Sequence, residues 1–116
     1  LAKTLFKDQE FYKGIKYVNI IHSFDENRKF SSNSFKSLGL DIKDFKSEDC
    51  YMNAYDKSDM TIIVNDIKDP IIKKIKKDSS YSKILKSKKV HVYDLDYSSA
   101  DCSIKIREII KKIRSL

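Results

Sequence analysis

The fold of this 116-residue chain is decided by residues 58–66, which read Ser58-Asp59-Met60-Thr61-Ile62-Ile63-Val64-Asn65-Asp66. The five residues at positions 60–64 carry no charge and are β-branched or apolar, and polar residues flank them on both sides. A short apolar run between polar residues is typical of a strand that is buried on both faces of a parallel sheet. The neighbouring segments have helical patterns, so this stretch predicts the central strand of a layered α/β domain.

Two further segments have strand patterns. Residues 17–21 are rich in β-branched and aromatic residues, and residues 90–93 alternate around a short strand. Helical segments long enough for crossover connections separate the three strands. The sequence therefore predicts a three-layer α/β/α domain with a central, mostly parallel sheet.

The helical segments have recognisable beginnings and ends. Asp69-Pro70 is expected to open one helix, with the aspartate as its cap and the proline at the first helical position. The last helix is expected from about Ser99 to Leu116, and residues 1–13 have a weak amphipathic pattern that ends at Gly14. Residues 41–45 are a candidate for a minor strand.

The composition excludes several classes of site. The chain contains only two glycines, Gly14 and Gly39, so it has neither a GxGxxG loop nor a phosphate-binding P-loop. Cys50 and Cys102 lie far apart without a CxxC motif, so we expect free thiols and no zinc or redox pair. No serine or cysteine stands in a nucleophile motif, and no HExxH or paired-carboxylate spacing occurs. We therefore expect no enzymatic activity, no intrinsic cofactor and no metal site.

The charge of the chain is compatible with two interpretations. There are 24 Lys and Arg against 17 Asp and Glu, a formal net charge of +7. Such a balance suits an acidic ligand, a nucleic acid or an anionic membrane surface. The basic residues are nearly all lysines, however, and Ile, Asn, Lys and Tyr are frequent throughout, which is also typical of AT-rich codon usage.

From residue 15 onward, the order of these patterns resembles the C-terminal lobe of the substrate-binding proteins of siderophore-, haem- and cobalamin-type (class III) ABC importers. The segment Lys57-Ser58-Asp59-Met60-Thr61-Ile62-Ile63-Val64 stands where that family usually reads alanine-aspartate-proline-aspartate-valine-isoleucine. The best match is Asp69-Pro70 followed by residues 81–93, which resemble a family segment that runs from a tryptophan to valine-tyrosine. Ser58 and Tyr81 depart from the usual proline and tryptophan.

The resemblance implies a function, a location and partners. Residues 1–14 would be the end of an interlobe or leading helix, and residues 15–116 a single ligand-binding lobe of a bilobal periplasmic-binding-protein fold. The lobe would capture a ferric siderophore, haem or a cobalamin-like ligand in the cleft between two lobes. Its partners would be the ABC permease and an N-terminal lobe. Its location would be extracytoplasmic, at the cell surface or in the periplasm, anchored like a lipoprotein through a segment outside this chain.

Carried over by position, the cleft loops would be residues 22–30, 65–68 and 94–99. All three follow predicted strands, and ligands of open α/β sheets bind beyond the carboxyl ends of the strands. The candidate ligand-binding residues are His22, Ser23, Arg28, Asn65, Asp66 and Tyr97.

Each of these residues also has a structural interpretation. Arg28 is a candidate to pair with a carboxylate, catecholate or propionate, or else it is a solvated loop residue. His22 is either an iron or haem ligand or the cap of a strand. Tyr97 either stacks on a flat ligand or covers the sheet edge, and Asn65 and Asp66 also suit a helix-entry turn.

An alternative function belongs to another class. The chain would then be a small basic α/β module that binds an acidic partner or nucleic acid through residues 73–89 and 111–114. A nucleic-acid interface would normally add exposed aromatic residues or arginines to its basic face. Most aromatic residues here fall in strand and core patterns, so we expect no nucleic acid partner.

Overall fold

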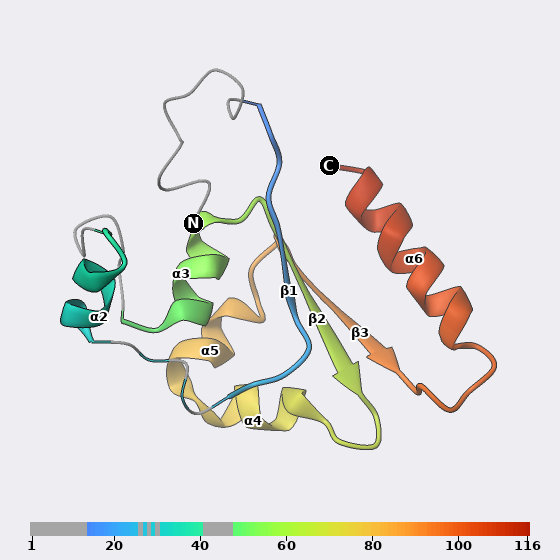
Figure 1. Ribbon diagram of the computed structural model, residues 1–116. Helices are drawn as coiled ribbons and strands as arrows, with labels where there is room; N and C mark the ends of the chain where they lie inside the picture. Colours follow the sequence, from blue (N-terminus) through green and yellow to red (C-terminus); the bar gives the residue numbers. More distant parts are fainter. Residues whose placement is uncertain (1–13, 26, 28, 30, 41–47) are drawn as a thin grey trace.

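The computed structural model describes residues 14–25, 27, 29, 31–40 and 48–116. They form an α/β domain around one open sheet of three parallel strands, in the order β1-β2-β3. The strands are β1 (Val18–Ile21), β2 (Met60–Asp66) and β3 (Val90–Leu95). The helices are α2 (Ser32–Ser37), α3 (Cys50–Lys57), α4 (Ile71–Lys77), α5 (Ser79–Ile84) and α6 (Cys102–Arg114). The predicted fold class is confirmed (Figure 1).

Strand β2 is the centre of the molecule. It pairs with β1 on one side, where Ile20 is opposite Ile62, and with β3 on the other, where Val92 is opposite Ile63. Every residue from Met60 to Asn65 is buried. Because side chains alternate along a strand, this continuous burial requires a layer of packing on each face of the sheet.

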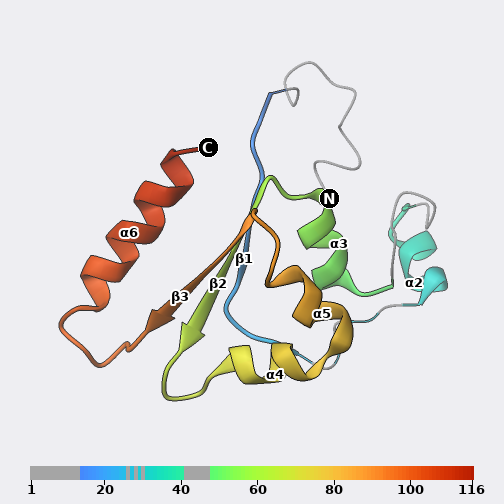
Figure 2. The same ribbon diagram turned by 180° about the vertical axis from the view of Figure 1, so that it is seen from behind.

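The first face of the sheet packs against α3, α4 and α5, which lie together on one side of the strands (Figures 1 and 2). Both crossovers, from β1 to β2 and from β2 to β3, therefore run over this face. Its buried cluster consists of Ile21, Ile63, Ile71, Ile75, Tyr81, Ile84 and Val90.

The second face packs against α6 alone among the described elements. Its buried cluster consists of Met60, Ile62, Val64, Leu95 and Ile109. Ile20 of β1, on the same face, is 49% exposed. Helix α6 thus leaves part of β1 exposed to solvent on this face of the sheet.

The structure also corrects some predicted boundaries. β2 and β3 each extend two residues beyond the predicted strands, because their ladder continues through the pairs Asn65–Asp94 and Asp66–Leu95. Asp69 does not cap α4: Pro70 is the N-cap residue, and no side chain of the cap position bonds to the helix. The last helix begins at Cys102, not near Ser99.

Several predictions concern other parts of the chain. The leading helix of residues 1–13, the minor strand of residues 41–45 and Arg28 lie outside the described residues. The two cysteines, both among the described residues, are half-buried and form no disulfide. No helix in the described ranges is both long enough and apolar enough to cross a bilayer.

Candidate functional site

The carboxyl ends of the three strands meet at one edge of the sheet, and the connections diverge there. The chain leaves β2 toward the first face, where α4 lies, whereas it leaves β3 toward the second face, where α6 lies (Figure 1). Such a divergence between neighbouring strands opens a crevice that open α/β sheets use for ligands.

A cavity of about 400 Å³ lies at this edge. All three strand-end loops contribute to it, and the first turn of α4 completes it. Its lining residues are His22, Ser23, Phe24, Asp25, Asp66, Asp69, Ile71, Lys74 and Tyr97. This volume is at the lower end of the range for small-molecule sites, about 300–1,000 Å³.

The loop after β1 is held in place by its aromatic residue. The ring of Phe24 makes an edge-to-face contact with Tyr81, with a centroid distance of 4.8 Å, and a tilted contact with Tyr51 at 6.2 Å. Tyr81 is buried in the first-face cluster, so Phe24 attaches the loop to the core. The side chains before it, His22 and Ser23, are exposed at the cavity.

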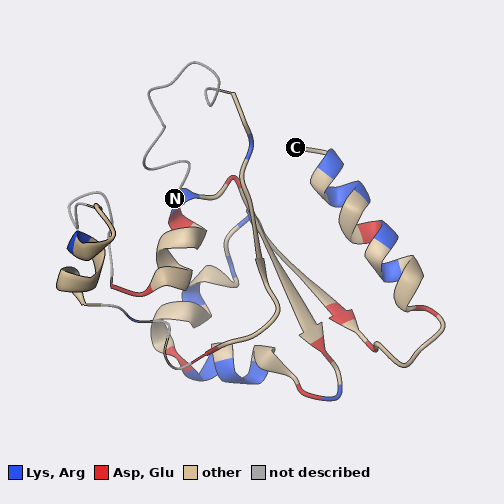
Figure 3. Cartoon of the chain, viewed as in Figure 1, with Lys and Arg blue, Asp and Glu red and all other residues tan. Residues whose placement is uncertain are grey.

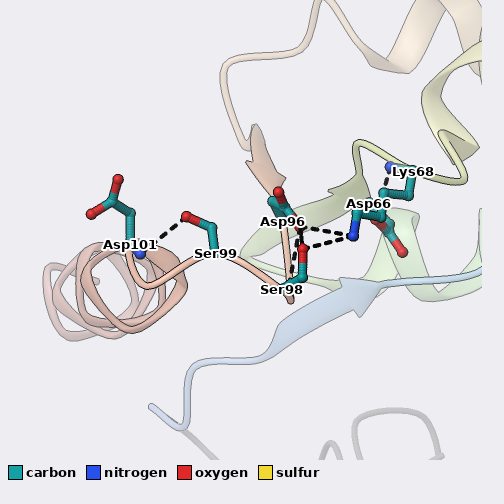
Figure 4. A network of polar contacts seen from close by, with 6 residues as sticks. All are labelled: Asp66, Lys68, Asp96, Ser98, Ser99 and Asp101. Carbon is teal, nitrogen blue, oxygen red and sulfur yellow. Dashed lines mark hydrogen bonds and ion pairs between the residues drawn. The ribbon is translucent and has the colours of Figure 1, made fainter.

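The loops after β2 and β3 are joined to each other by polar contacts (Figure 4). The backbone N–H of Ile67 donates to the carbonyl of Leu95 at 3.0 Å, and the Lys68 ammonium donates to the Ser98 hydroxyl at 2.6 Å. The same ammonium lies 3.8 Å from the Asp96 carboxylate. These contacts fix the backbone on both sides of Tyr97, a residue that is 60% exposed and lines the cavity.

Asp96 stabilises this junction from within its own loop. Its carboxylate accepts hydrogen bonds from the Ser98 hydroxyl at 2.7 Å and the Ser98 backbone N–H at 3.0 Å. These two bonds, with the nearby Lys68 ammonium, lower the pKa of the Asp96 carboxyl. Asp96 is thus held as an anion beside the cavity.

Asn65 is buried, and it does not line the cavity. Its side-chain N–H donates to the Asp94 carboxylate at 2.8 Å, and its side-chain oxygen accepts from the backbone N–H of Ile72 at 3.1 Å. The second bond satisfies one of the free N–H groups at the start of α4, a task that the sequence assigns to Asp69. Asn65 therefore holds the helix that carries part of the cavity wall.

Four of the six candidate residues come together in the cavity: His22, Ser23, Asp66 and Tyr97. Arg28 lies outside the described residues. The Asn65 side chain is hydrogen-bonded to Asp94 and Ile72 and does not line the cavity. Sequence reasoning missed Asp69 and Lys74 as lining residues. Lys74 follows Ile71 by three positions and so shares its side of α4.

The lining is polar and carries more negative than positive groups. Asp25, Asp66 and Asp69 supply three carboxylates, and Lys74 supplies one ammonium among the lining residues that the structure describes. Within the same described ranges, no three His, Cys, Asp or Glu side chains are grouped closely enough to hold a metal ion. The cavity can accept hydrogen bonds through its carboxylates and offer aromatic contact through Tyr97 and Phe24.

Comparisons with known proteins identify no relative. No protein-family model, no curated protein and no solved structure matches this chain.

Proposed function

We propose that this chain is the ligand-binding lobe of a substrate-binding protein of an ABC importer, with no chemistry of its own. The proposal rests on one observation: loops from all three parallel strands converge on one cavity at the carboxyl ends of the strands. The resemblance of the sequence to the class III family points to the same edge of the sheet. The transported ligand would be a ferric siderophore, haem or a cobalamin-like molecule.

The size of the cavity supports a ligand shared between two lobes. A volume of about 400 Å³ accommodates a part of such a ligand, and a facing lobe would enclose the rest. On this proposal the partners are an N-terminal lobe, which would face the cavity, and the permease of the importer. The setting is extracytoplasmic, at the cell surface or in the periplasm, with a lipoprotein-type anchor.

The charged side chains among the described lining residues indicate which kind of ligand surface the cavity favours. Three carboxylates and one ammonium favour a ligand surface that presents hydrogen-bond donors or positive charge, and they disfavour the propionate side of haem at this wall. A flat ligand face would contact Tyr97, an exposed aromatic residue that lines the cavity.

Titration of the chain with ferric siderophores, haem and cobalamin, followed by calorimetry, tests this proposal. We expect weak binding, because one wall provides only part of the buried contact that pockets usually give. Tyr97→Ala should weaken the binding by about 0.5–1.5 kcal/mol, the value of one aromatic contact. Asp66→Asn should also weaken it.

The matched control is Lys83→Ala on α5, an exposed position that does not line the cavity. It should leave the affinity unchanged. An equal loss from Lys83→Ala and Tyr97→Ala, or no binding of any of the three ligand classes, would contradict the proposal.

A further inference from the structure

Helix α6 uses only part of its surface to pack on the sheet. Ile109 is buried, and Cys102 and Ile113 are half-buried against the second face. These three residues follow a helical spacing of seven and four, so they form one stripe. The remaining circumference of the helix is turned away from the core (Figures 1 and 2).

Positive charge runs along α6, as it also does along the shorter helix α4 (Figure 3). Five of its thirteen residues are basic and one is acidic, which gives a net charge of +4 against +7 for the whole chain; the basic residues are Lys105, Arg107, Lys111, Lys112 and Arg114. Glu108 pairs with Lys105 at 3.7 Å. Arg107, Lys111 and Arg114 are exposed and, with spacings of four and three, form one row along the helix.

Exposed isoleucines flank this row on both sides. Ile104 precedes Arg107 by three positions and lies on one side of the row, and Ile110 follows Arg107 by three and lies on the other. Ile104 is 54% exposed and Ile110 is 44% exposed. Large apolar side chains and cations therefore alternate across one outward surface.

We propose that this outward surface of α6 docks on an anionic phospholipid bilayer, with the helix lying in the plane of the interface. Helices of this kind combine apolar side chains, which enter the headgroup region, with Lys and Arg, which attract acidic lipids. Clusters of four to eight basic residues on an amphipathic helix indicate such binding. The proposal uses none of the cavity residues and does not depend on the proposed ligand.

Charge and composition favour a lipid surface over other occupants. A second copy docked through the same surface would bring two helices of net charge +4 together, and the like charges would repel. A nucleic acid would be expected to contact exposed aromatic residues beside the cations, and α6 contains no aromatic residue.

The test is cosedimentation of the full chain with vesicles of phosphatidylcholine alone and of phosphatidylcholine containing one-third phosphatidylglycerol. We expect binding only to the anionic vesicles, and weaker binding at roughly 1 M salt than at 0.1 M, because salt screens exposed charges. The triple variant Arg107→Gln/Lys111→Gln/Arg114→Gln should lower the partition coefficient on the order of 100-fold, since each basic residue near an anionic surface contributes about fivefold.

The matched control changes the same amount of charge elsewhere. Lys73, Lys76 and Lys77 are exposed on α4, and Lys73→Gln/Lys76→Gln/Lys77→Gln removes three positive charges as well. This variant should keep most of the binding. Ile104→Ser, which leaves the charge unchanged, should weaken binding, whereas Leu38→Ser at a 70% exposed position on the C-terminal side of α2 should not.

Three outcomes would overturn the proposal. The first is an equal loss in the two triple variants, which would indicate diffuse attraction by the net charge. The second is absence of binding to anionic vesicles, and the third is concentration-dependent dimerisation abolished by the α6 variant, which would identify a second copy as the occupant. Circular dichroism of each variant verifies the fold, and Lys111→Gln alone provides a milder change with the same expected direction.

Discussion

Asn65 connects three elements of the molecule through one side chain. It stands in β2, donates to Asp94 of β3 and accepts from Ile72 of α4. The side chain is buried, so neither bond is readily replaced by water. The position of α4, and with it that of Asp69 and Lys74 in the cavity wall, depends on this residue.

We predict that Asn65→Ala lowers the free energy of unfolding by about 1–3 kcal/mol, because it leaves buried partners unsatisfied. Urea denaturation followed by circular dichroism measures this loss. Asn33→Ala, at an exposed position of α2, is the control and should change stability by no more than about 0.5 kcal/mol. Similar values for the two variants would show that the Asn65 bonds contribute little.

At the scale of elements, a lysine that is distant in the sequence caps the carboxyl end of α3. The Lys89 ammonium donates to the carbonyls of Tyr55 at 2.6 Å and Ser58 at 3.0 Å. It also lies 4.3 Å from the centre of the Tyr55 ring. The last carbonyls of a helix lack partners within it, and a cation there is further favoured by the helix dipole.

Lys89→Met keeps much of the side-chain length and removes the charge and the hydrogen bonds. We expect a loss of about 1.5–3 kcal/mol in stability, the range for hydrogen bonds that involve a charged group. Lys88→Met changes an exposed neighbour and should cost less than about 0.5 kcal/mol. The urea midpoints of the two variants measure the difference; equal midpoints would rule out a capping role for Lys89.

The helix-end contacts show what sequence patterns capture and what they miss. The caps of α2 by Ser31 and of α3 by Asp49 are local, and both were predictable from residues next to the helix. The bonds from Asn65 to α4 and from Lys89 to α3 join residues that only the sheet brings together. A local capping rule therefore selected Asp69 for α4, whereas the packed structure uses Asn65.

The same limit applies to the cavity. Buried strands and crossover lengths predict where strand ends meet, and this placed His22, Asp66 and Tyr97 at one edge of the sheet. The sequence does not give the angle at which a helix leaves that edge. For this reason the sequence did not predict that Asp69, just before α4, and Lys74, within α4, line the cavity.

At the scale of the whole molecule, two described groups with lowered pKa values contribute to the pH dependence of stability. Burial and the nearby Lys112 charge lower the pKa of His91 below its ordinary value of 6.5. As the pH falls, the unfolded chain therefore binds a proton at His91 at a higher pH than the folded protein does. The free energy of unfolding decreases as the pH drops below 6.5. The lowered pKa of Asp96 acts in the same direction at lower pH, because its stabilising contribution is lost as the pH falls through the folded pKa.

We predict that the free energy of unfolding decreases between about pH 7 and pH 5, and that His91→Gln removes much of this decrease. Urea denaturation at several pH values measures it. His22→Gln, on an exposed loop, should keep the decrease. A pH profile that is the same for the original chain and His91→Gln would contradict the assignment.

The all-parallel order of the sheet has a consequence for the chain as it is synthesised. The ladder between β1 and β2 joins residues 42 positions apart, and the ladder between β2 and β3 joins residues 29 apart. Contacts at such separations form slowly compared with hairpins or local helices. On the ribosome, β2 emerges well before β3, so the strand that is most completely buried in the folded domain has one unpaired edge until β3 is made. An exposed strand edge can form hydrogen bonds with strands of other chains. Until residues 90–95 arrive, this nascent protein is therefore most vulnerable to aggregation at the strand that later becomes its centre.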